Sequence, residues 1–125
     1  MSHFTTIHTE IKDITALRAA CAEMDLLLLE QAKARGYNEQ ERAGDYVIRL
    51  KGPYDIALNS ASSGRFELTT DWWNGHVERE VGPNYGRLLQ FYGVHKTLRE
   101  AQRSRCTVQR ETQEDGAIKL TLEEL

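Results

Sequence analysis

The chain has 125 residues, a net charge of −3, 40% hydrophobic residues and 28% charged residues. These values fit a single domain over residues 1–125 with its own core, and they exclude a disordered or collagen-like chain. The longest unbroken apolar run, residues 26–29, is far shorter than the roughly 20 residues that span a bilayer. We therefore expect a soluble protein that does not enter membranes.

The N-terminal residues and the cysteines indicate a reducing compartment. No basic segment followed by an apolar stretch opens the chain, so neither a signal peptide nor a transit peptide is expected. Cys21 and Cys106 lie far apart at apolar positions, and no Cys-x-x-Cys motif is present. Free thiols are then the expectation, which favours the cytoplasm, or the plastid stroma if the protein is organellar.

The first third of the chain predicts a strand, a helix and a second strand. Residues 4–11 alternate in the manner of a strand and are rich in β-branched side chains. Asp13 is placed to cap a helix, whose buried face would carry Ile14, Leu17, Cys21 and Met24. The leucines from Leu26 predict a buried strand, and the polar residues 31–44 predict a loop.

The remaining chain predicts three strands, a long helix and a hairpin. The strands are expected at residues 46–50, 54–59 and 65–73, separated by turn signals. Residues 84–104 predict the helix, with an apolar stripe of Leu88, Phe91, His95 and Leu98. Residues 106–111 and 117–122 flank Asp115-Gly116, a strong hairpin signal.

This order, β-α-β-β-β-β-α-β-β, predicts an α+β fold. Strands joined by short turns imply a mainly antiparallel sheet, and two helices can cover only one of its faces. We therefore predict a two-layer sandwich whose other sheet face is open to solvent or to a partner.

Several segments together resemble a known family. They are Met1-Ser2-His3-Phe4, Arg35-Gly36-Tyr37, Tyr46-Val47-Ile48, Tyr54-Asp55-Ile56, Asp71-Trp72-Trp73, Leu89-Gln90-Phe91-Tyr92 and the hairpin with Asp115-Gly116-Ala117-Ile118-Lys119-Leu120. Over nearly the whole chain they resemble the hypothetical chloroplast reading frame thirty-five family of cyanobacteria, other bacteria and algal plastids. The resemblance implies a cytoplasmic or stromal protein that works beside an AAA-type ATPase, and it implies no activity.

The Trp72-Trp73 pair is the most informative local feature. Successive strand residues point to opposite faces, so Trp72 should continue the core face and Trp73 should lie on the open face. Asp71, Phe4 and His8 are expected on that same face. An aromatic set on an open sheet face is typical of an interface, although Trp73 could instead pack under the following loop.

The histidines do not form a metal-binding pattern. His3, His8, His76 and His95 have no local ligand spacing, so no metal site, cofactor or catalytic residue is predicted. A metal site assembled from His3, Asp71 and His95 is an alternative. A ligand or enzyme pocket near His95, Tyr92 and Asp71, bordered by residues 74–85, is the main alternative to an interaction domain.

The second predicted helix carries a basic stripe. Lys96, Arg99 and Arg103 recur at helical spacing on its solvent side. The stripe could bind phosphates of a nucleic acid or an acidic surface, or it could complement the helix dipole at the C-terminal end.

The sequence therefore favours a small accessory or adaptor protein, not an enzyme, that self-associates or docks on a larger protein. The interface candidates are Trp73, Asp71, Phe4 and His8, with the basic stripe as a second surface. A ligand-binding domain or enzyme is the first alternative, and nucleic-acid binding is the second.

Overall fold

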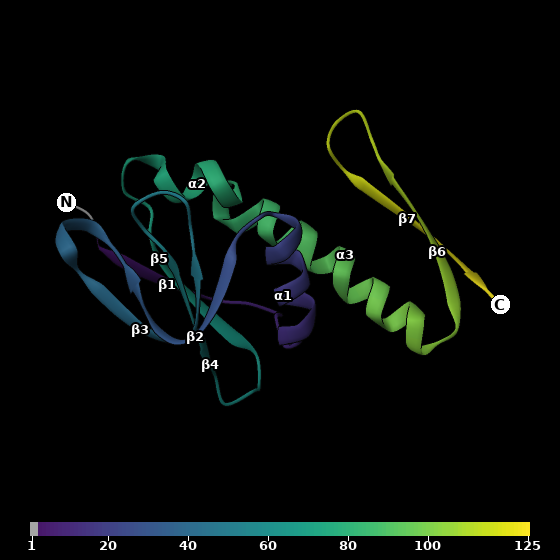
Figure 1. Cartoon of the computed structure of the whole chain (residues 1–125), viewed down its shortest axis with the longest axis horizontal. Coiled ribbons are helices and arrows are strands. Elements are labelled where there is room, and N and C mark those ends of the chain that lie inside the picture. The colour runs from purple at the N-terminus through teal and green to yellow at the C-terminus, as the bar shows by residue number, and fades with distance from the viewer. Residues whose placement is uncertain (1–2) are drawn as a thin grey trace.

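The computed structural model describes residues 3–125. Its strands are β1 (Phe4–His8), β2 (Leu27–Arg35), β3 (Glu41–Arg49), β4 (Ile56–Ser60), β5 (Phe66–Asp71), β6 (Cys106–Thr112) and β7 (Ile118–Glu124). Its helices are α1 (Ile14–Glu23), α2 (His76–Val81) and α3 (Gly86–Arg103), with short 3-10 turns η1 (Tyr37–Glu39), η2 (Trp73–Gly75) and η3 (Pro83–Tyr85). The predicted order is confirmed, with α2 added (Figure 1).

One antiparallel sheet of five strands, in the order β1-β5-β4-β3-β2, forms the body of the molecule. The two long helices α1 and α3 pack on one of its faces. The core between sheet and helices includes Leu17, Cys21, Ile48, Ile56, Leu58, Leu68, Leu88 and Tyr92. The α+β class with the two long helices on one face is therefore confirmed.

The helix cap at Asp13 is also confirmed. The Asp13 carboxylate accepts a hydrogen bond from the Ala16 amide at 3.1 Å, at the start of α1. This bond satisfies one of the amides that the first helical turn leaves without a partner. The helix then buries Leu17 and Cys21 on the predicted face.

The short helix α2 has no counterpart in the sequence prediction. Its six residues are too few to show helical periodicity, although Val77 and Val81 are both buried. Glu80 connects it to the turn between β3 and β4, where its carboxylate accepts hydrogen bonds from the amides of Lys51 at 2.7 Å and Gly52 at 3.0 Å. The helix thus fixes the edge of the core beside that turn.

The β2–β3 hairpin corrects two predictions. Residues 31–44, predicted as a loop, instead continue both strands up to the turn at η1. The strand predicted as buried lies at the edge of the sheet, and Leu27 is 64% exposed. The pairing runs through main-chain hydrogen bonds along a polar segment, so there is no apolar alternation from which the strands could be predicted.

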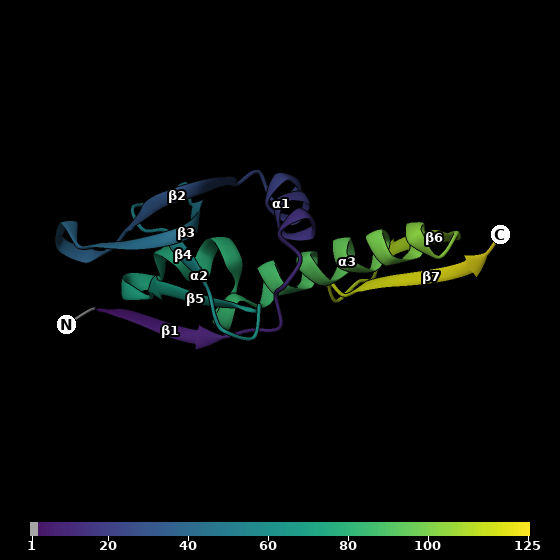
Figure 2. The ribbon, with the colours of Figure 1, turned by 90° about the horizontal axis from the view of Figure 1, so that it is seen from below.

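The far half of this hairpin folds over the sheet face that the helices leave free. A Cβ at Gly44 would lie 2.4 Å from the carbonyl oxygen of Tyr46, so the bend in β3 requires glycine. Ala34 then packs on Val47 and Ala57, and all three are completely buried. The turn of the hairpin curls at one end of the sheet (Figure 2). The face predicted to be open is therefore covered in its middle by the chain itself.

An ion pair between a buried carboxylate and a half-buried guanidinium holds the folded hairpin in place. The Asp55 side chain has no exposed surface, and its carboxylate accepts hydrogen bonds from Arg35 Nε and Nη2, each at 2.8 Å. The same carboxylate also accepts from the backbone amides of Arg35 at 2.9 Å and Leu50 at 3.1 Å. Its hydrogen bonds raise the pKa of the Arg35 guanidinium. Asp55 thereby joins the end of β2 to the end of β3 and the start of β4.

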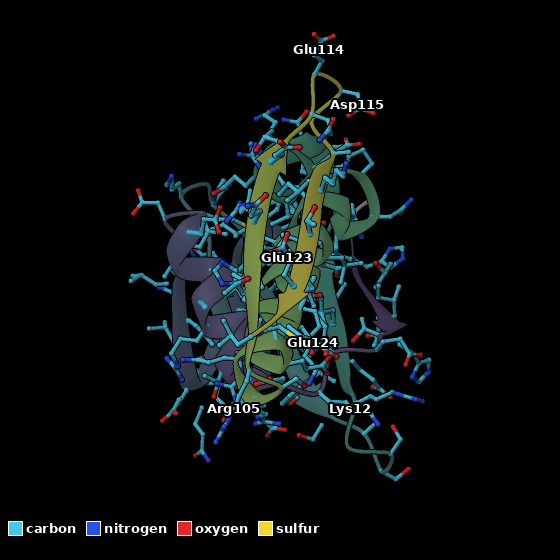
Figure 3. The ribbon with its side chains drawn as sticks, turned by 90° about the vertical axis from the view of Figure 1, so that its right-hand side faces the viewer. Lys12, Arg105, Glu114, Asp115, Glu123 and Glu124 are labelled. Carbon is cyan, nitrogen blue, oxygen red and sulfur yellow. The ribbon has the colours of Figure 1, made fainter. Side chains whose placement is uncertain are left out.

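The C-terminal hairpin forms a separate sheet of β6 and β7. It packs on the side of α3 that faces away from the main sheet, and Figure 3 shows it in front of that helix. Arg110 of β6 anchors it: the guanidinium contacts the Glu23 carboxylate at the end of α1, with distances of 2.5 Å and 3.1 Å. Near the turn, Gln90 Nε2 donates to the carbonyl oxygen of Gly116 at 3.0 Å.

Replacing the buried carboxylate tests the role of the ion pair. We expect Asp55→Asn to lower the free energy of unfolding by about 2 kcal/mol, because the amide nitrogen that replaces one carboxylate oxygen cannot accept the hydrogen bonds that reach this buried position. Asp45→Asn is the matched control, since Asp45 is exposed and accepts one bond from the Ser60 amide; it should cost less than about 1 kcal/mol. Urea unfolding measures both, and equal effects would contradict this role for Asp55.

The anchor of the C-terminal hairpin should give a pH-dependent contribution to stability. The hydrogen bonds from Arg110, which outweigh partial burial, and those from His95 hold the pKa of the Glu23 carboxyl below its ordinary value of 4.5. A lowered pKa stabilises the fold above that ordinary value, and the contribution is lost as the pH falls through the folded-state pKa.

We therefore expect Glu23→Gln to be less stable than the wild type by about 1 kcal/mol at neutral pH. The difference should fade below the ordinary pKa of glutamate. The control is Glu30→Gln, because the exposed Glu30 only meets Arg18 at 3.5 Å. Urea unfolding at several pH values measures the effect. A difference between wild type and Glu23→Gln that does not change with pH would contradict the anchoring role.

Candidate functional site

Asp71, the last residue of β5, organises the backbone beneath an aromatic surface. Its side chain is completely buried. One carboxylate oxygen accepts a hydrogen bond from the Tyr37 amide at 3.1 Å, and the other accepts from the Trp73 amide at 2.9 Å. The prediction that Asp71 itself belongs to an exposed contact surface is wrong, because the tip of the β2–β3 hairpin covers it. Asp71 instead supports the two neighbouring aromatic residues.

Trp73 and Tyr37 lie together on the surface. Their rings meet edge to face with centroids 5.5 Å apart, and they remain 44% and 39% exposed. Trp73 begins the turn η2, which passes through Asn74 and Gly75 at φ values of 57° and 72°. This left-handed turn directs the chain away from the sheet and leaves the Trp73 ring on the outside.

Trp72 lies on the opposite side of the backbone from Trp73. It packs against the hydrophobic core and contacts the buried ring of Tyr85, with ring centroids 4.8 Å apart. The division of the two tryptophans that strand alternation predicts is therefore present, although β5 ends at Asp71, two residues before the predicted end at residue 73.

Phe4 belongs to the same region, whereas His8 does not. Phe4 pairs with Asp71 across β1 and β5, and the Arg42 guanidinium lies 5.3 Å from the centre of its ring. His8 pairs with Glu67 at the other end of β1. Four residues of strand separate these positions by roughly 13 Å. We call Phe4, Tyr37 and Trp73 the aromatic corner.

Tyr37 and Arg42 were not predicted as site residues, because both fall in the segment predicted as a loop. Gly36 lies against Phe4, where a Cβ would come within 2.5 Å of the ring, and the turn reverses through Asn38 with φ 54°. Asparagine tolerates the left-handed conformation and is typical of tight turns. Asn38 between two polar segments was the available signal of a hairpin.

A hollow of about 660 Å³ adjoins the aromatic corner, next to Tyr54 and the turn η1. Burial raises the pKa of the Tyr54 hydroxyl, and the negative charge of Asp71 adds to the shift. A second hollow of about 810 Å³ lies between α3 and the C-terminal hairpin, where Arg87, Phe91 and Arg110 line it. Both are open surface features between charged and apolar side chains.

The basic stripe of α3 is largely engaged within the chain. Arg99 Nε lies 2.8 Å from Asp13, while Lys96 lies 3.7 Å from Asp13 and 3.3 Å from Glu100. Burial opposes ionisation of Asp13, but the Ala16 amide and the Arg99 guanidinium outweigh it and lower the pKa of its carboxyl. Arg103 is exposed, and no ion pair to it is found in the described part of the chain. Most of the stripe thus stabilises the junction of α1 and α3.

The structure does not bring His95, Tyr92 and Asp71 together. His95 Nε2 lies 2.7 Å from Glu23 Oε1. The Tyr92 hydroxyl accepts hydrogen bonds from the amides of Lys12 and Asp13, both at 3.2 Å. These two side chains lie on the helical side of the sheet, and Asp71 lies on the other side. The predicted common pocket is therefore not formed.

Among residues 3–125, the cysteines form no disulfide and no metal-binding cluster is found. Cys21 and Cys106 are free thiols, and burial raises the pKa of Cys21 to about 12. Among residues 3–125, no group of three His, Cys, Asp or Glu side chains is placed to hold a metal ion. Within the same range, none of the helices is long and apolar enough to cross a membrane.

Comparison with known proteins places the chain in a family. Residues 20–121, from α1 into β7, match the family described as "Protein of unknown function (DUF1257)". The chain is 28% identical over 127 residues to the "Uncharacterized protein ycf35" of Guillardia theta, with 98% of this chain and 97% of that protein covered. No solved structure matches. The resemblance found in the sequence is confirmed, and the chain belongs to the DUF1257 family.

Proposed function

We propose that this protein is a small non-enzymatic accessory protein that docks on a larger protein through the aromatic corner. The observation that carries the proposal is the exposed pair of Trp73 and Tyr37, whose backbone amides are both held by the buried carboxylate of Asp71. Tryptophan and tyrosine are the residues that most often dominate binding energy at protein interfaces.

The way the corner is supported favours binding. A side chain that is already ordered loses less conformational freedom when a partner covers it. The Trp73 and Tyr37 rings contact each other, and Phe4 is packed beneath Gly36. Arg42 lies over the Phe4 ring and adds a positive charge at the rim. We therefore expect an apolar contact bordered by an acidic group of the partner.

The resemblance to the hypothetical chloroplast reading frame family gives the first partner to test, an AAA-type ATPase of the same organism. The free cysteines support a reducing compartment, and we propose the cytoplasm or, in an organellar setting, the plastid stroma. Binding of nucleic acid receives less support, because Lys96 and Arg99 are paired with acidic side chains.

The test is removal of the exposed tryptophan. We expect Trp73→Ala to change the free energy of unfolding by less than about 1 kcal/mol, because its ring is 44% exposed. The same variant should lose the larger protein that wild type retains. Affinity capture from native lysate, with the co-purified proteins quantified, measures the loss, and a pull-down with the purified ATPase tests the named partner.

Leu27→Ala is the matched control, because Leu27 is an exposed apolar residue of the edge strand β2. It should retain the same partner as wild type. Equal recovery by Trp73→Ala and wild type would contradict docking through this corner. So would a large loss of stability in Trp73→Ala, since it would show that the ring serves the fold.

A further inference from the structure

The C-terminal hairpin has a free strand edge. It contains only β6 and β7 among the residues that the structure describes, and two-stranded sheets are marginally stable alone. Exposed apolar side chains occur on β7 and directly after it. Leu122 within the strand is 46% exposed, and Leu125 just beyond the strand is 86% exposed. An unpaired strand edge that carries exposed apolar side chains invites pairing with another strand.

The pairing within the hairpin determines which backbone groups of β7 point outward. The Gln113 amide donates to Ala117, and the Leu125 amide donates to Arg105. The register between β6 and β7 is unbroken between these two bonds. Because hydrogen-bonded and non-bonded pairs alternate in antiparallel strands, the odd-numbered residues of β7 bond to β6. The outward groups therefore belong to residues 118, 120, 122 and 124.

Charge complementarity selects one register for a second copy. If two β7 strands pair antiparallel about Thr121, Lys119 of each copy lies opposite Glu123 of the other, and Leu120 lies opposite Leu122. The outward backbone amides and carbonyls of one β7 strand then face the outward amides and carbonyls of the other. Shifting the centre to Leu120 places Lys119 opposite Thr121, and shifting it to Leu122 places Leu120 opposite Glu124. Only the register centred on Thr121 neutralises both charges.

We propose that two copies of this chain pair through β7 across a two-fold axis at Thr121. The two hairpins then form one four-stranded antiparallel sheet, with both α3 helices on the same face. On that face Leu122 would be covered by Leu120 of the second copy. On the other face Lys119 and Glu123 are exposed and available for pairing. Figure 3 shows this outer face, on which Glu123 is labelled.

The β6 edge is less suited to the same arrangement. Pairing about Gln109 would place Thr107 opposite Glu111 and Val108 opposite Arg110. Neither pair combines opposite charges or two apolar side chains. Moreover, Arg110 is already paired with Glu23. This dimer uses a surface different from the aromatic corner, so either proposal can fail without the other.

The first experiment uses two single variants and their mixture. Lys119→Glu gives glutamate at both positions, and Glu123→Lys gives lysine at both, so either variant alone places like charges opposite each other twice in the dimer. We expect the dissociation constant of each to rise about tenfold or more. An equimolar mixture should recover wild-type association, because a mixed pair restores both attractions. Sedimentation equilibrium measures all three samples.

Glu124→Lys is the control for the change in charge. It alters the net charge as much as Glu123→Lys, but in this register it faces Ile118 and should leave the dissociation constant within about threefold of wild type. A wild-type protein that stays monomeric at about 100 μM would overturn the proposal. Equal weakening by Glu124→Lys and Glu123→Lys, or a mixture that stays monomeric, would overturn it as well.

The second experiment tests the register directly. In a background with Cys106→Ser, Thr121→Cys places two thiols at a non-hydrogen-bonded pair, where Cα atoms lie about 4.5 Å apart and a disulfide can form. Mild oxidation should give a covalent dimer on a non-reducing gel. Glu123→Cys should not, because its opposite residue is Lys119. Equal cross-linking of the two variants would overturn the register.

Discussion

The contact between Arg35 and Asp55 governs the arrangement of the sheet. Asp55 is completely buried, so the oxygens of its side chain need several donors, and Arg35 together with two backbone amides supplies them. Those donors come from the end of β2 and the end of β3. Satisfying one carboxylate therefore requires the hairpin to fold back over the sheet. Ala34 is carried with it onto Val47 and Ala57, and the three side chains form a small second core on this face.

The aromatic corner is a consequence of the same fold-back. Tyr37 lies two residues after Arg35, and its amide reaches Asp71 only because the hairpin end is held against the sheet. Two buried aspartates, one just before β4 and one on β5, thus determine the position of this hairpin together. Asp55 fixes the hairpin, and Asp71 fixes the turn of that hairpin and the turn after β5. The exposed rings have defined positions although both are carried by turns, which are usually the most mobile parts of a fold.

Local patterns in the sequence predicted the parts of the fold that local forces determine. The Asp13 cap, the buried face of α1 and the separation of Trp72 from Trp73 all follow from the spacing of neighbouring residues. The β2–β3 hairpin could not be predicted in this way, because residues 31–44 are polar and their partners, Asp55 and Asp71, lie 20 and 34 residues away in the chain. Tyr37 was missed for this reason, and Asp71 was wrongly placed on the surface because strand alternation cannot show that another segment covers it.

The long helix α3 joins the two ends of the molecule. The turn of the β2–β3 hairpin lies at one end of the long axis, and the β6–β7 hairpin lies at the other (Figure 1). A pair of molecules joined at the second end would therefore display its two aromatic surfaces far apart and facing outward. Such a pair could bind two neighbouring subunits of one oligomeric partner at the same time, one through each aromatic corner. Weak individual contacts would then add up to slow release, because the second contact forms at a high effective concentration.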